Sequence, residues 1–61
     1  MKLTEQEKHL ILKCVEELSE LSVELIHAVN KPKKNNQKNI HLEIKDVELY
    51  LNEIKNFLVT K

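Results

Sequence analysis

The chain has 61 residues, so it holds one domain at most, and a domain of this size buries only about 60% of the surface that its unfolded form exposes. Ten lysines, no arginine and ten acidic residues give a formal net charge of zero, which provides no electrostatic footprint for a nucleic-acid polymer. The single cysteine cannot form an internal disulfide, so we expect a metal ion or self-association to stabilise so small a domain.

The first predicted element is a long helix over about residues 5–30. Thr4 and Glu7 have the spacing of a capping box, so Thr4 should cap this helix. Apolar residues then recur at intervals of three or four, which is the spacing of one helix face. They are Leu10, Cys14, Leu18, Leu21, Leu25 and Ala28. Cys14 belongs to this stripe, which favours a small core residue over a reactive thiol.

A basic, polar loop over residues 31–39 is predicted next, because Pro32 is incompatible with a helix interior. A second helix over about residues 40–58 follows, with Asn39 as its expected cap. Its apolar stripe is Ile40, Ile44, Val47, Leu51, Ile54 and Leu58. The chain should therefore be a single all-α domain, an antiparallel helical hairpin. One hairpin leaves apolar surface exposed, so we expect a homo-oligomer, a dimer or a dimer of dimers, built as a four-helix bundle.

Acidic residues border the apolar stripe on both predicted helices. Glu17 and Glu20 lie along one edge of the first stripe, and Glu43 and Asp46 along one edge of the second. Whether the two pairs face each other within one hairpin depends on the register that the loop imposes. The alternative is a solvated acidic surface, which is the usual setting of Glu on a helix.

Four carboxylates that are brought together repel one another and lose hydration, so they need cations or protons. Lys45 is the only basic residue within the two acidic stretches, residues 16–21 and 42–49. A hard divalent cation satisfies such a site, and Mg²⁺ or Mn²⁺ would complete its coordination with water or phosphate oxygens. The acids therefore predict a site for one of these ions.

The pattern Glu16-Glu17-x-x-Glu20, then 22 residues, then Glu43-x-x-Asp46 resembles the EExxE…ExxD signature of MazG-like, all-α nucleoside triphosphate pyrophosphohydrolases. The similarity extends over about residues 10–58 and is closest to the short versions of phages and bacteria. It implies Mg²⁺-dependent cleavage of an NTP or dNTP between the α- and β-phosphates. By this resemblance Glu17, Glu20, Glu43 and Asp46 are metal ligands, and Glu16 assists a second ion or the attacking water.

The remaining polar residues suggest how a nucleotide would be held. Lys33, Lys34 and Lys38 belong to the basic loop and could meet phosphates, although a solvated loop is the usual explanation of such residues. Tyr50, four residues after Asp46, could stack on a base or pack in the core. Two alternatives to an enzyme stay open: a nucleotide-binding protein without turnover, and a structural helical module that oligomerises.

The expected location is the cytoplasm, or the host cytoplasm if a phage encodes the chain. The lone cysteine suits a reducing compartment, and the sequence has neither a signal peptide nor an apolar run of 18 residues. We therefore predict a soluble protein without a membrane partner.

Overall fold

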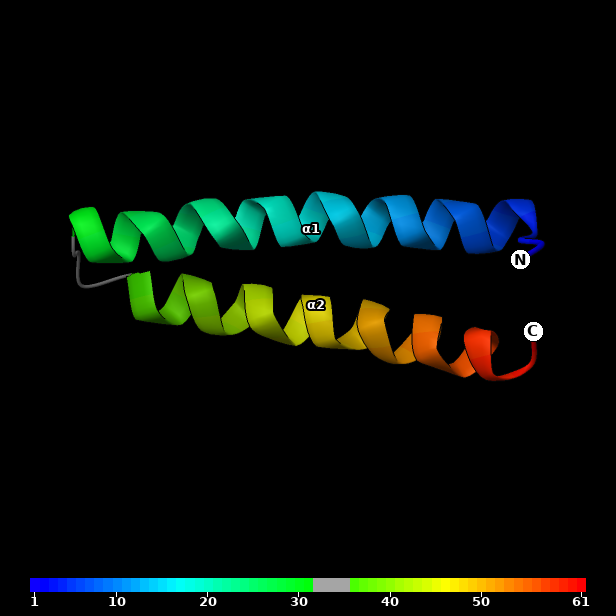
Figure 1. The fold of residues 1–61 in the computed structure, drawn as a ribbon. Coiled ribbons are helices and arrows are strands. Elements are labelled where there is room, and N and C mark those ends of the chain that lie inside the picture. The colour runs from blue at the N-terminus through cyan, green and yellow to red at the C-terminus, as the bar shows by residue number, and fades with distance from the viewer. Residues whose placement is uncertain (32–35) are drawn as a thin grey trace.

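The computed structural model describes residues 1–31 and 36–61 and forms a helical hairpin. Helix α1 spans Glu5–Asn30 and helix α2 spans Asn36–Val59. The two helices run antiparallel, side by side along their lengths, and both chain termini lie at the same end (Figure 1). The hairpin measures 42 × 14 × 14 Å. The prediction of an all-α hairpin is confirmed, since the described residues contain two helices and no strand.

The start of α1 is the capping box that the sequence predicts. The Thr4 Oγ1 atom accepts a hydrogen bond from the Glu7 backbone N–H at 3.1 Å, and Glu7 Oε1 accepts one from the Thr4 backbone N–H at 2.8 Å. These bonds satisfy two of the donors that a helix start leaves free. The Lys61 ammonium also pairs with Glu7 Oε1 at 2.6 Å, so the last residue of the chain is joined to the first turn of α1.

The second helix starts earlier than the sequence indicates. Asn36–Asn39 belong to the first turn of α2, so the prediction of a loop continuing to Asn39, with that residue as the cap, is wrong. The first turn of a helix tolerates polar residues, because its backbone N–H groups have no carbonyl acceptor within the helix and polar side chains can serve them instead. The Asn36 side-chain amide donates to the Lys31 carbonyl at 3.3 Å, which links the end of α1 to the start of α2. The predicted helix break at Pro32 lies outside the described residues.

The core between the helices is thin. Among the described residues only Cys14, at 2% exposure, and Val47, at 5%, count as buried apolar residues. The prediction that Cys14 is a core residue is confirmed, and its thiol is free. Half-buried residues continue this contact along both helices. They are Leu10, Leu21 and Ala28 on α1 and Ile40, Tyr50, Ile54 and Phe57 on α2. The hairpin therefore holds together through one narrow contact between the two stripes.

Other members of the predicted stripes remain in water. The exposed members are Leu18 and Leu25 on α1 and Ile44, Leu51 and Leu58 on α2.

Neither helix, within the residues described, is long and apolar enough to cross a membrane.

Candidate metal centre

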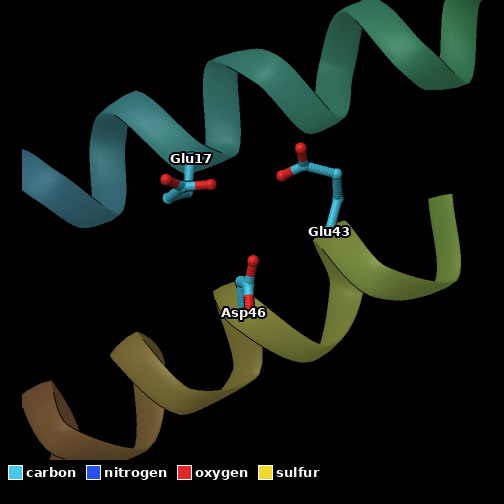
Figure 2. Close-up of side chains that lie close together, drawn as sticks. All are labelled: Glu17, Glu43 and Asp46. Atoms are coloured by element: carbon cyan, nitrogen blue, oxygen red, sulfur yellow. The ribbon is translucent and has the colours of Figure 1, made fainter. Parts of the chain in front are cut away.

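Three carboxylates from the two helices converge beside the middle of the hairpin. Glu17 comes from α1, and Glu43 and Asp46 come from successive turns of α2 (Figure 2). One oxygen from each lies within 4.8 Å of the other two. Figure 2 shows the side chains of Glu43 and Asp46 extending from α2 toward α1, into the space beside Glu17. We call Glu17, Glu43 and Asp46 the carboxylate cluster.

The helix positions of these residues explain why they meet. Glu17 lies one turn after the buried Cys14, and Asp46 directly precedes the buried Val47. The antiparallel arrangement brings the middles of both helices to the same level, so the acids flank the most buried part of the hairpin. Glu17 and Glu43 are half-buried, and Asp46 is exposed. The cluster therefore opens to solvent on its Asp46 side.

Glu43 is the least solvated member of the cluster. Its Oε2 atom is buried and has no hydrogen-bond partner among the described residues. A buried polar atom without a partner typically costs about 1 to 3 kcal/mol, more when it is charged. This oxygen thus has both the position and the free lone pairs to bind a cation.

The lysines of the described residues do not neutralise the cluster. Within residues 1–31 and 36–61 the ion pairs are Lys8–Glu5, Lys13–Glu16 and Lys61–Glu7, and none includes a cluster member. Two like charges about 4 Å apart repel by about 1 kcal/mol in water and about 4 kcal/mol near a protein surface. Three such charges favour the binding of a cation.

The spacing of the cluster oxygens can be compared with the spacing in a magnesium site. Mg²⁺ binds oxygen at about 2.0–2.1 Å in an octahedron, which places neighbouring ligand oxygens about 3 Å apart and opposite ones about 4.2 Å apart. The cluster oxygens lie within 4.8 Å of one another, so a shared ion would require the three side chains to adopt this octahedral spacing. Three protein ligands leave the remaining positions for water or phosphate oxygens.

Glu20 is near the cluster but is not one of the three converging acids. The negative charge of Glu17 raises the pKa of Glu20, with smaller contributions from lost hydration and from the charge of Glu16. Glu20 is exposed, so it adds to the negative field without sharing the geometry of the other three. Its role as a metal ligand stays a prediction.

The other predicted site residues are distributed less closely. Glu16 is exposed and pairs with Lys13 at 3.7 Å, so its catalytic role also stays a prediction. Lys38 is exposed in the first turn of α2, and Tyr50 is half-buried one turn after Asp46. Lys33 and Lys34 lie outside the described residues. Phosphate binding by the three lysines Lys33, Lys34 and Lys38 and base binding by Tyr50 therefore stay predictions.

Sequence reasoning treated the acids as equivalent, whereas the structure distinguishes Glu43. Helix position alone does not give this difference, because Glu17 lies between Cys14 and Leu21 just as Glu43 lies between Ile40 and Val47. The spacing separates only these two half-buried acids from the exposed Glu20 and Asp46.

Comparisons with family models, with curated proteins and with solved structures found no match to this chain. The MazG-like resemblance therefore stays a prediction from the sequence.

Proposed function

We propose that the protein is a Mg²⁺-dependent nucleoside triphosphate pyrophosphohydrolase, which converts an NTP or dNTP to the monophosphate and pyrophosphate. The observation that carries this proposal is the convergence of Glu17, Glu43 and Asp46 with no lysine partner among the described residues. These residues come from both halves of the EExxE…ExxD pattern, which lie 22 residues apart in the sequence.

The proposed chemistry assigns a separate task to each group of residues. The carboxylate cluster would hold the ion, with the buried oxygen of Glu43 as one ligand and Asp46 on the solvent side from which a nucleotide would enter. When bound, the ion would supply Lewis-acid chemistry, by withdrawing charge from phosphate oxygens and lowering the pKa of coordinated water. Glu20, exposed on the same helix as Glu17, would be a further metal ligand, and Glu16 would assist a second ion or the attacking water. Water then adds across the bond between the α- and β-phosphates.

The same proposal includes self-association, since the hairpin buries few apolar residues of its own. Two hairpins would form a four-helix bundle, as a dimer or within a dimer of dimers. The basic residues Lys33, Lys34 and Lys38 would meet the phosphates, and Tyr50 would border the base.

A nucleotide-binding protein without turnover is the second candidate function, and it is favoured by the size of the hairpin. Two helices with extents of 14 Å across offer little depth to enclose a base or to exclude water from the reaction. A structural oligomerisation module is the third candidate, in which the carboxylate cluster would have no ligand.

A nucleotide panel separates these candidates. The wild-type protein is incubated with each NTP and dNTP in the presence of Mg²⁺, and pyrophosphate is measured. Turnover that Glu43→Gln abolishes and Glu53→Gln leaves intact supports the enzyme, because Glu53 is exposed on the same helix and outside the cluster. Metal-dependent binding without pyrophosphate supports the second candidate. Absence of both, in a stable oligomer, supports the third.

A further inference from the structure

The side of the hairpin opposite the carboxylate cluster is apolar on both helices. Helix positions three or four apart share a face. Glu17 and Glu43 are half-buried in the contact between the two helices, and Asp46 is exposed on one side of that contact. Because the helices are antiparallel neighbours, the margins of α1 and α2 that lie away from Asp46 also lie together, on the other side of the hairpin. We call this second surface the apolar face.

Helix α1 contributes a continuous strip to the apolar face, with alternating intervals of four and three residues. Its members are Ile11, Val15, Leu18, Ser22, Leu25 and Val29. Ile11 is half-buried and the other five are exposed, with Val15 at 52% exposure and Val29 at 82%. Strict alternation of four and three is the spacing with which helices pack along a shared seam.

Helix α2 contributes three leucine or isoleucine residues at intervals of seven, and all three are exposed. They are Ile44, Leu51 and Leu58. They lie beside Ile40, Val47 and Ile54, which pack toward α1. The apolar stripe of α2 is thus wider than its contact with α1, and the excess is on the side away from Glu43 and Asp46.

The serines of α1 do not interrupt the apolar character of this surface. The Ser22 hydroxyl donates to the Leu18 carbonyl at 3.0 Å, and the Ser19 hydroxyl donates to the Val15 carbonyl at 3.0 Å. Each donor is already bonded within its own helix, so burying it in an interface would leave no unpaired O–H group. Small residues also allow two helices to approach closely.

The exposed area of the chain supports a partner of similar size. The hairpin exposes 5154 Å². A compact monomer of 7.2 kDa is expected to expose about 4,100 Å². The difference, roughly 1,000 Å², is comparable to the area of about 800 Å² that each partner buries in a stable protein–protein interface.

We propose that the apolar face binds the apolar face of a second copy of this chain, which places each carboxylate cluster on the outer side of the resulting four-helix bundle. This inference specifies the interface of the oligomer proposed above, and it builds each metal site within a single chain. A second copy fits because both helices carry heptad spacing and because the flanking residues Lys8, Glu48 and Lys55 carry both signs of charge. The same surface on two copies is self-complementary, as a two-fold dimer requires.

Charge substitutions at matched positions test the interface. Leu18→Lys and Leu51→Lys introduce a charge into the apolar face, whereas Leu49→Lys introduces it on α2 outside that face, at a residue that is 64% exposed. Sedimentation equilibrium at micromolar concentration should show wild type and Leu49→Lys as associated. Both face variants should have a dissociation constant raised by roughly 30-fold or more.

A second variant covers the case in which the charged variants unfold. Ser22→Leu makes the α1 strip uniformly apolar, so it should strengthen association by about tenfold, with a matching rise in thermal stability at low protein concentration. A folded, monomeric wild type at high micromolar concentration would overturn the proposal. Dissociation by Leu49→Lys with association unchanged in Leu18→Lys would overturn it as well.

The proposed metal site and the proposed interface can be disproved independently of each other. Glu43→Gln should leave sedimentation unchanged, because Glu43 is half-buried between α1 and α2 of one chain and is not among the residues of the apolar face. If this variant also binds Mg²⁺ as tightly as wild type, the proposed function is wrong while the interface stands. If Glu43→Gln dissociates the oligomer, the clusters are buried between copies and the proposed interface is wrong.

Discussion

The carboxylate cluster and the apolar face lie on opposite sides of the same two helices, and they differ in what each leaves unsatisfied. The cluster has three converging acids, and the buried oxygen of Glu43 has no hydrogen-bond partner within residues 1–31 and 36–61. The apolar face has exposed leucine, isoleucine and valine residues and one serine, Ser22, whose hydroxyl is already bonded. The proposals above assign a cation to the first surface and a second copy of the chain to the second surface. If both proposals hold, the hairpin separates ligand binding from self-association by using a different side for each.

The largest expected effect follows from removing apolar contact at the centre of the apolar face. Leu51→Asp should leave the chain largely unfolded at micromolar concentration, because a charge cannot be buried in the interface without a partner and the isolated hairpin has few buried residues. Circular dichroism melts of wild type should shift to higher temperature as protein concentration rises. A melting temperature that is independent of protein concentration would show that the chain does not self-associate, and the apolar face would then have no role that distinguishes it from the cluster side.

The second effect concerns the cluster. With Mg²⁺ or Mn²⁺ at a hundredfold excess over its dissociation constant, wild type should gain about 2.7 kcal/mol in the free energy of unfolding. Glu43→Gln should lose this gain, yet remain as stable as wild type in EDTA or become more stable, because the like charges no longer repel. Melts with metal and with EDTA measure both, and calorimetry gives the affinity. Equal metal affinity in Glu43→Gln, Glu17→Gln and the control Glu53→Gln would exclude a carboxylate site.

A change outside both surfaces provides the reference for these effects. Thr4→Ala removes the acceptor of the Glu7 backbone N–H and should reduce stability by about 1 kcal/mol. Since Thr4 belongs to neither surface, chemical denaturation should show this loss equally with and without metal. A selective loss of metal affinity in Thr4→Ala would mean that the end of the hairpin influences the cluster.

The smallest effect is a pH dependence next to the cluster. The charge of Glu17 raises the pKa of Glu20, so ionised Glu20 destabilises the metal-free fold. This cost is absent below the pKa of the unfolded chain and develops as the pH rises through the raised pKa of the folded state. Glu20→Gln should therefore be slightly more stable than wild type at neutral pH in EDTA, and the difference should disappear on acidification.

Glu7 provides the opposite sign in the same titration. The hydrogen bond from Lys61, followed by the one from the Thr4 backbone, lowers the pKa of Glu7. Its contribution to stability is present above the pKa of the unfolded chain and is lost as the pH falls through the lowered pKa of the folded state. Glu7→Gln should therefore flatten the acid limb of the stability curve, below the range in which Glu20 acts. An unchanged acid limb would show that the Lys61 contact is too exposed to contribute.

Much of the hairpin could be predicted because its signals are local. The Thr4–Glu7 capping box lies within one turn. The spacing of the apolar residues is sufficient to predict both helices. The start of α2 was placed too late because polar residues such as Asn36 and Asn39 suit a first turn as well as a loop. For the site, the sequence predicts which acids take part but does not show which of them is most buried, because the burial of each side chain depends on the opposite helix.

The sequence by itself determined two amphipathic helices and a row of acids along one margin of each, because helical periodicity fixes which residues share a face. Only the tertiary structure decided that Glu17 of α1 meets Glu43 and Asp46 of α2, since this requires the register of two antiparallel helices. It also decided which apolar residues the hairpin uses for itself. Cys14 and Val47 are buried, while Leu18 and Leu51 stay exposed, because two cylinders touch along one line and each stripe is wider than that contact.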